Sequence, residues 1–153
     1  MARMSDLTPA QQAHLEDLDC PVFASTPWVS GPPLAQRSVA LVSTAGLMLR
    51  GERPVMANDV RFRPIPHDTG AGDVLMSHVS VNFDRSGFQR DINVVLPRDR
   101  LSELAQAGII GGIGPNHYAA MGAIHPRELE HSTRALAATL AGEGVDSAVL
   151  LPV

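Results

Sequence analysis

The chain has 153 residues, of which 44% are hydrophobic and 18% charged, and its formal net charge at pH 7 is −4. This length suits one domain with a single core, and the acidic balance excludes the basic surface that nucleic acids and anionic membranes attract. All twelve basic residues are arginine, which excludes Schiff-base and P-loop lysine chemistry. No apolar run approaches the roughly 20 residues of a membrane span, and the first residues do not read as a secretory signal. We therefore expect a cytoplasmic protein with no membrane or nucleic-acid partner.

The chain begins with a strong helix-start pattern. Thr8 can cap a helix, Pro9 suits its first position, and Gln11 completes a capping box, so a helix is predicted through residue 17. A proline-rich arm follows, and the single cysteine, Cys20, lies in it directly after an aspartate, where a packed or incidental thiol is expected. We expect this helix and arm to occupy residues 1–33 and an α/β domain to occupy residues 34–153.

Short aliphatic runs separated by helical patterns follow the arm. The runs that predict buried strands are Val39–Ser43, Val74–Met76, Ile92–Leu96 and Ala148–Leu151. Helices are predicted from Pro97 or Asp99 to Ala107 and from Pro126 to Gly142 or Gly144. An edge strand is predicted at Val60–Pro66 and a loop at Val79–Gln89. The stretch Ile109–Gly114 is expected to be a strand or a close-packed connection. The alternation predicts a single α/β domain with a mostly parallel sheet and flanking helices, in Rossmann-like or flavodoxin-like layering.

Small polar and titratable residues follow the strands of this predicted sheet. In an open parallel sheet the carboxyl ends of the strands share one edge, and ligands bind in the crevice beside that edge. We therefore expect a substrate pocket made by Ser43, Thr44, His78, His117 and Tyr118, with His78 donating to an anionic or carbonyl group.

Two other kinds of site are weaker alternatives. Arg50 and Arg53 are candidates for carboxylate recognition, although solvated surface roles suit both. His78, Asp84 and His117 could serve a metal-assisted hydrolase, yet they are spread over distinct loops, as is His125, without the spacing of metal ligands. We expect no metal site.

Four segments of the chain resemble a known family. They are V-A-L-V-S-T-A-G-L-M-L-R-G-E-R-P at 39–54, S-H-V-S-V-N-F-D-R-S-G-F at 77–88, D-I-N-V-V-L-P-R-D-R-L at 91–101, and the stretch 109–122 with H-Y-A-A-M-G. These segments resemble the selenoprotein B family, the selenoprotein subunits of glycine, sarcosine, betaine and D-proline reductases, and the match runs from about Pro27 to Val153. The chain is most similar to the short, single-domain members.

The resemblance implies an oxidoreductase that cleaves a carbon–heteroatom bond of a small amino-acid-like substrate, with thiols as electron source. It also implies a thiol reductant such as a thioredoxin-like protein as partner, and either a homo-oligomer or a place in a reductase complex. The family's redox motif, a selenocysteine followed closely by a cysteine, comes after the final strand. We therefore expect no catalytic residue in this chain, a selenocysteine just after Val153 in the full-length protein, and a further C-terminal helix. The 153 residues alone are expected to be inactive.

A second interpretation remains open. The chain could be a non-catalytic domain that binds a small molecule or associates with another subunit. The codon after Val153 distinguishes the two interpretations, because an in-frame UGA followed by a cysteine codon would indicate the reductase.

Overall fold

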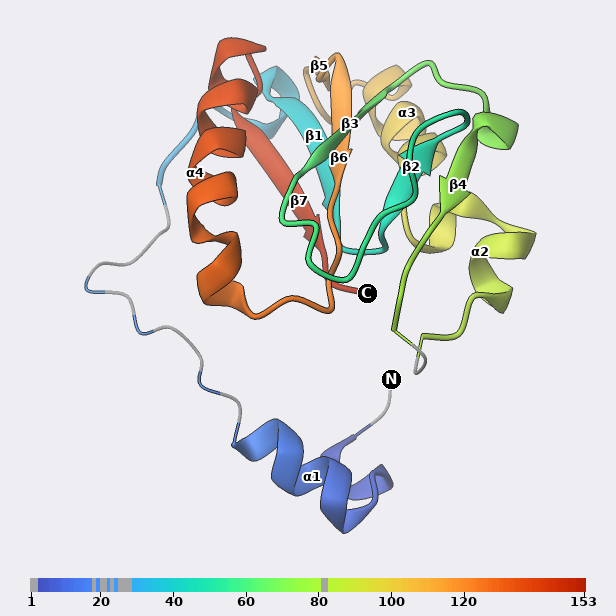
Figure 1. Ribbon diagram of the computed structural model, residues 1–153. Helices are drawn as coiled ribbons and strands as arrows, with labels where there is room; N and C mark the ends of the chain where they lie inside the picture. Colours follow the sequence, from blue (N-terminus) through green and yellow to red (C-terminus); the bar gives the residue numbers. More distant parts are fainter. Residues whose placement is uncertain (1–2, 18, 20–21, 23, 25–28, 81–82) are drawn as a thin grey trace.

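The structure, a computed structural model, describes residues 3–17, 19, 22, 24, 29–80 and 83–153. It holds one five-stranded sheet, a two-stranded sheet and helices on both faces (Figure 1). The strands are β1 (Ser38–Ser43), β2 (Leu47–Leu49), β3 (Arg63–Pro66), β4 (Val74–Met76), β5 (Gly112–Ile113), β6 (Asn116–Ala119) and β7 (Ser147–Leu151). The helices are α1 (Pro9–Glu16), α2 (Ser86–Arg90), α3 (Arg98–Gln106) and α4 (Pro126–Gly142).

Strand β1 is the centre of the larger sheet, and three strands pair with it in parallel. β5 and then β6 run along one side of β1, where Val39 pairs with Ile113 and Val42 with Tyr118. β7 runs along the other side over its whole length. β3 adds an antiparallel edge strand next to β6. The predicted fold class, a single α/β domain with a mostly parallel sheet and flanking helices, is confirmed.

Each face of the sheet packs against a different layer. On one face Val42 and Tyr118 contact Leu136 of α4. On the other face a larger core includes Leu41, Ile65, Leu96 and Leu101, and it joins the sheet to α3 and to the β2–β4 pair. The sequence pattern explains this, because aliphatic side chains fill both faces of β1, as a strand covered on both sides requires.

Several predicted elements are confirmed. Thr8 caps α1: its Oγ1 accepts the Gln11 N–H at 3.4 Å, and Gln11 Oε1 accepts the Thr8 N–H at 3.0 Å. β1 and β7 match their predicted strands, β3 is the predicted edge strand, and α3 and α4 lie at the predicted positions within one or two residues.

The strand predicted at Ile92–Leu96 is wrong. Residues Ile92–Val94 form a 3-10 helix, started by Asp91, whose side chain accepts the Asn93 N–H at 2.9 Å. Ile92, Val95 and Leu96 are buried while Val94 is 63% exposed, which is a helical spacing of apolar side chains. The aliphatic run is thus one turn of helix leading into α3.

The position of β4 also differs from the prediction. Val74–Met76 is a strand, but it pairs antiparallel with β2, with Leu47 opposite Met76, and does not join the central sheet. β2, β6 and the short helix α2 are elements that we did not predict, and β5 is only two residues of the stretch Ile109–Gly114.

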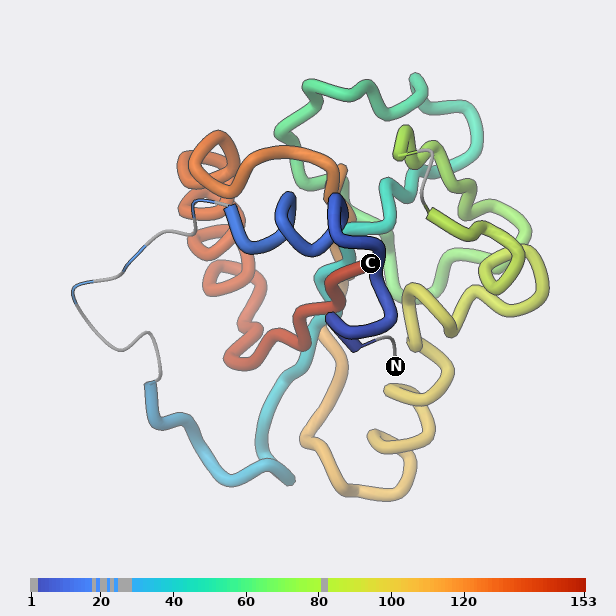
Figure 2. The backbone as a smooth tube through the Cα atoms, turned by 90° about the horizontal axis from the view of Figure 1, so that it is seen from below, coloured from blue at the N-terminus to red at the C-terminus, as the bar shows by residue number. Residues whose placement is uncertain are grey.

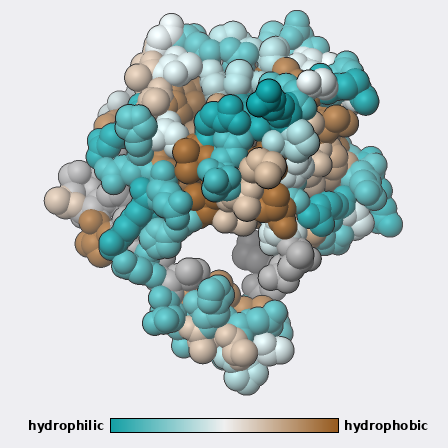
Figure 3. Space-filling view, in the orientation of Figure 1, coloured by the Kyte–Doolittle hydropathy of each residue, from teal (hydrophilic) through white to brown (hydrophobic). Residues whose placement is uncertain are grey.

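Helix α1 lies below the carboxyl edge of the sheet and apart from it (Figures 1 and 2). In the space-filling view, open space separates α1 from the α/β domain (Figure 3). The described contacts that link the arm to the domain include an ion pair of 2.6 Å between Asp19 and Arg127 at the start of α4, and a hydrogen bond of 2.7 Å from Arg37 to the Pro32 carbonyl. The boundary at residue 33 stays a prediction. Within the described part of the chain, no helix combines the length and apolarity needed to cross a bilayer.

Candidate functional site

The carboxyl end of β1 carries the two hydroxyl residues of the predicted pocket. Ser43 is fully buried, and its Oγ accepts the Ala45 N–H at 3.2 Å, so it terminates the strand. Thr44 Oγ1 accepts the Val153 N–H at 2.9 Å, and the Thr44 N–H donates to the Leu151 carbonyl at 3.1 Å. Both residues therefore lie at the predicted edge, where Thr44 holds the ends of β1 and β7 together and the Ser43 hydroxyl accepts from the backbone just after β1.

A tight backbone turn at Gly46 brings His78 to the same edge. Gly46 has a φ of +62°, which favours glycine, and its carbonyl accepts the Ser77 N–H at 2.9 Å. A Cβ on Gly46 would lie 3.1 Å from the Cα of His78. The structure thus brings Ser43, Thr44 and His78 together within a few residues of the end of β1.

His78 lies in a closed environment at this edge. It is 6% exposed, and its ring stacks on Phe83 with 4.7 Å between the ring centroids. Its Nδ1 accepts the Ser80 N–H at 3.1 Å, so the neutral ring carries its proton on Nε2. Burial, and secondarily the charge of Arg85, lower the pKa of His78. At pH 7 the residue is a neutral donor, and its buried Nε2 has no hydrogen-bond partner among the described residues.

Arg85 organises the loop around His78, and we did not predict this role. It donates to the His78 carbonyl at 2.6 Å and to the Ser80 carbonyl at 3.1 Å. A guanidinium with several donors can hold two carbonyls of one turn at once. The segment F-D-R-S-G-F at 83–88 carried the signal, because Phe83 and Arg85 follow His78 within a few residues.

His117 lies further inside the sheet than the predicted edge. It is 1% exposed, it pairs with Ile65 of β3, and its Nδ1 accepts the backbone N–H of Leu41 at 3.2 Å. Burial, followed by the charges of His67 and Arg98, lowers the pKa of His117 to about 4. The ring is therefore neutral at pH 7 and joins β6 to β1.

Tyr118 faces the opposite side of the sheet from His117, because neighbouring residues of a strand alternate. Its hydroxyl donates to Glu143 Oε1 at 2.7 Å, at the end of α4, and Asn116 donates to the same oxygen at 2.6 Å. Burial and the Glu143 carboxylate raise the pKa of Tyr118 to about 12. Tyr118 and His117 thus do not share a surface with each other, and Tyr118 points away from the edge that holds His78.

The residues of the weaker metal hypothesis are engaged separately. Asp84 accepts the Ser86 N–H at 2.8 Å, and the Ser86 hydrogen bonds lower its pKa. His125 caps α4, with its Nδ1 accepting the Arg127 N–H at 3.2 Å. Over the described ranges, no group of three or more His, Cys, Asp or Glu side chains is arranged to hold a metal ion. Cys20 lies outside the described residues.

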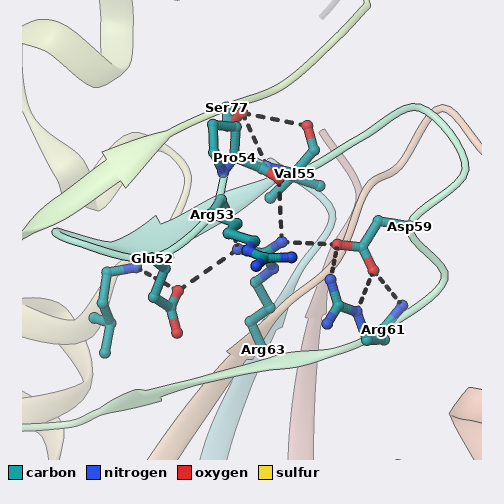
Figure 4. Close-up of polar contacts among 9 residues, drawn as sticks. Glu52, Arg53, Pro54, Val55, Asp59, Arg61, Arg63 and Ser77 are labelled. Carbon is teal, nitrogen blue, oxygen red and sulfur yellow. Dashed lines mark hydrogen bonds and ion pairs between the residues drawn. The ribbon is translucent and has the colours of Figure 1, made fainter.

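An ion cluster lies beside the same edge of the sheet (Figure 4). Arg63 begins β3 and donates to Asp59 Oδ2 at 2.7 Å, and both side chains are at most 10% exposed. Arg61 binds Asp59 through two further hydrogen bonds of 2.7 and 2.8 Å. These arginines hold the pKa of Asp59 well below its usual range. The cluster was not predicted, although the alternation D-V-R-F-R of an edge strand places its charges on one side.

The two arginines proposed for carboxylate recognition differ in their surroundings. Arg50 forms an exposed ion pair of 3.3 Å with Asp73 and donates to the Gly72 carbonyl at 2.5 Å. The Arg53 side chain has no hydrogen-bond or ion-pair partner among the described residues, while its carbonyl accepts from Arg63 at 2.6 Å. Arg53 is therefore the freer of the two guanidinium groups.

The fold defines a small α/β domain with a mostly parallel sheet, and comparison with known proteins gives a nearer relationship. The chain is 30% identical over 151 residues to the D-proline reductase subunit gamma of Acetoanaerobium sticklandii. The alignment covers 96% of this chain but only 61% of that relative's length. It supports a relationship to a reductase subunit, without extending to the selenoprotein B assignment. No family model matches, and no solved structure matches significantly.

Proposed function

We propose that the chain is part of a thiol-dependent reductase of the selenoprotein B type, which cleaves a carbon–heteroatom bond in a small amino-acid-like substrate. The observation that carries the proposal is the similarity to a D-proline reductase subunit along 96% of the chain. The four segments that resemble the family include the turn around Gly46 and the loop around His78, which are the parts that form the edge site.

The chemistry sets what such a protein must supply. Opening a proline ring at its Cα–N bond consumes two electrons and two protons, which a dithiol supplies as it becomes a disulfide. A selenolate or thiolate is the nucleophile, and the partner that regenerates it is a thiol reductant such as a thioredoxin-like protein. The relative is a reductase subunit, which agrees with a place for this chain in a complex.

In this proposal the 153 residues contribute substrate binding rather than the redox pair. His78 offers a neutral Nε2–H donor, and Ser43 and Thr44 form the end of the strand beside it. The resemblance implies a selenocysteine and a nearby cysteine as the redox pair, and in this proposal that pair lies outside these 153 residues.

One observation favours the second candidate, a domain for subunit association. β7 is an edge strand of the sheet, and Leu150 and Val149 on it are 71% and 42% exposed. Exposed apolar residues on an unpaired edge are uncommon in a finished surface and suit contact with another chain.

Two measurements test the proposal. Sequencing the coding DNA beyond Val153 should give an in-frame UGA, a nearby cysteine codon and a helical reading frame. The protein read through that codon should then open D-proline with dithiothreitol as reductant, whereas the 153-residue chain should bind D-proline without turnover. A stop codon other than UGA, together with a chain that binds no D-proline, would support the association domain instead.

A further inference from the structure

The ion cluster at the start of β3 is held more rigidly than a surface ion pair. Arg63 donates to Asp59 Oδ2 at 2.7 Å and to the Arg53 carbonyl at 2.6 Å, and it lies 3.7 Å from Glu52 Oε2. Glu52 Oε2 in turn accepts the Leu49 N–H at 2.9 Å. Every one of these contacts fixes the turn between β2 and β3, so the groups around it are preorganised for a ligand.

The outer side of this cluster is an open depression. It has a volume of about 400 Å³ and is lined by Glu52, Arg53, Arg61, Phe62, Arg63 and Pro64. Phe62 and Pro64 give it an apolar wall, while Arg53 brings a guanidinium without a described partner and Glu52 a carboxylate. In the close-up, the charged groups of Arg53 and Arg63 lie between Glu52 and Asp59 (Figure 4).

Formal charges decide which ligand suits the depression. Three arginines face two carboxylates, so the group carries one net positive charge; the single carboxylate of Asp59 is shared by Arg61 and Arg63, and Arg63 also lies 3.7 Å from Glu52. The groups with capacity left are the Arg53 guanidinium, which can bind a carboxylate in a planar fork, and Oε1 of Glu52, which can bind an ammonium while Oε2 accepts from Leu49. A cation and an anion beside an apolar wall are complementary to a small zwitterionic amino acid with an apolar body.

The depression lies at the same edge of the sheet as the candidate site. Arg63 pairs with Ala119 of β6, and Ala119 pairs with Ser43 at the end of β1. A second connection runs through Ser77, which precedes His78: its Oγ accepts the Val55 N–H at 3.1 Å. Val55 follows Pro54, whose carbonyl accepts from Arg63 at 3.4 Å. The two sites are thus joined through the strand ends and through one short hydrogen-bonded segment.

We propose that the depression at Arg53 and Glu52 binds the carboxylate and ammonium groups of a small amino acid such as D-proline. The inference rests on the proposed function for the identity of the amino acid, and it names the residues that recognise its charged groups. Arg53 binds the carboxylate, Glu52 binds the ammonium, and Phe62 packs against the apolar part of the ligand. Arg63 and Asp59 are positioning residues that fix the turn.

The test is a titration of the 153-residue chain with D-proline, with pyrrolidine and with inorganic phosphate, followed by calorimetry and by the Nε–Hε signals of arginine in NMR spectra. D-proline should shift the Arg53 signal, whereas pyrrolidine, which lacks the carboxylate, should not. Arg53→Gln should weaken D-proline binding by about tenfold, the loss expected for a hydrogen bond to a charged group. Arg50→Gln is the matched control, because Arg50 lies in an exposed ion pair outside the depression, and it should bind like the unaltered chain.

Three results would overturn the inference. Equal affinity for D-proline in Arg53→Gln and the unaltered chain would place the ligand elsewhere and leave the reductase proposal standing. Phosphate that competes as strongly as D-proline would indicate a general oxyanion site. No binding of D-proline by the unaltered chain would also overturn it, and the codon after Val153 would then decide separately whether the reductase proposal fails.

Discussion

The backbone of Gly46 and the backbone of His78 are in direct contact. A Cβ at position 46 would lie 3.1 Å from the His78 Cα and 3.2 Å from its nitrogen, and also 3.1 Å from Met121 Cε. Two backbones can approach this closely only when one residue has no side chain, and the φ of +62° favours glycine for a second reason. The contact fixes His78 relative to the end of β1, so it links the fold to the candidate site.

Gly46→Ala should therefore lower the free energy of unfolding by about 3 kcal/mol, the sum of left-handed backbone strain and a displaced His78 segment. Gly51→Ala is the matched control. Gly51 also has a positive φ, of +90°, but an added Cβ would meet nothing within 4 Å, so only the strain of about 1 kcal/mol should remain. Urea unfolding measures both, and equal losses in the two variants would contradict the proposed contact.

Asp59→Asn should destabilise the protein because it leaves the buried Arg63 with only the more distant carboxylate of Glu52. Breaking a buried ion pair from one side costs about 3 kcal/mol, whereas the exposed Arg50–Asp73 pair should lose under about 1 kcal/mol in Asp73→Asn. The Arg61 and Arg63 hydrogen bonds lower the pKa of Asp59, so its contribution is complete above the unfolded-state pKa of about 4. The difference in the free energy of unfolding between the unaltered protein and Asp59→Asn should be constant from pH 5 to about 8 and should narrow below about pH 4. A difference that narrows already near neutral pH would contradict this assignment.

His117 should give the protein a stability that rises with pH. Its pKa is lowered from 6.5 to about 4 in the folded state, so between these values the unfolded chain binds more protons, and acidification favours unfolding. The expected loss from pH 6.5 to pH 4 is up to about 3 kcal/mol. His117→Gln keeps an acceptor for the Leu41 N–H and should flatten this dependence, apart from the share of His78, which has the same sign.

Urea unfolding at a series of pH values measures the slope for His117. His131→Gln, on the exposed side of α4, is the surface control for removing a histidine. An unchanged slope in His117→Gln would mean that the histidine is protonated within the fold and would contradict its role as acceptor.

The parts of the fold that could be predicted are those determined by local pattern. β1 and β7 are uninterrupted aliphatic runs, and α1 carries its own capping box, so neither needs knowledge of a distant partner. Ile92–Leu96 has the same aliphatic composition as a strand, and only Asp91 and the exposure of Val94 make it a helical turn.

β6 could not be predicted, because its polar side chains can be buried in a sheet only when residues far away in the chain hydrogen-bond to them. His117 accepts from Leu41, 76 residues earlier, and Tyr118 and Asn116 donate to Glu143, at least 25 residues later. The candidate site divides in the same way. His78 and Ser43 could be predicted from their places after strands, and the structure joins them through Gly46. Tyr118 packs against α4, and the sequence pattern alone does not tell on which face of the sheet that helix lies.

The last prediction concerns the unpartnered Nε2 of His78. A buried donor without an acceptor costs free energy, so its retention suits a group that a ligand completes. His78→Phe keeps an aromatic ring against Phe83 and removes this donor. It also removes the Nδ1 acceptor of the Ser80 N–H. The stability lost with that hydrogen bond should offset the stability gained by removing a buried unpaired donor, so the free energy of unfolding should change by less than about 1 kcal/mol.

Binding should respond differently from stability. His78 does not line the depression at Arg53 and Glu52 and its Nε2 is buried, so it can donate to a bound amino acid only when binding opens its contact with Phe83. In that case His78→Phe should weaken D-proline binding by about tenfold at pH 7, where the lowered pKa keeps the ring neutral. His125→Phe is the matched control, because His125 is also a histidine whose Nδ1 accepts a backbone N–H, but at the start of α4. Calorimetric titration measures the affinity and urea unfolding the stability of the same samples. Unaltered affinity in His78→Phe would show that the ring only packs against Phe83, because a donor that a ligand uses cannot be removed without loss of binding.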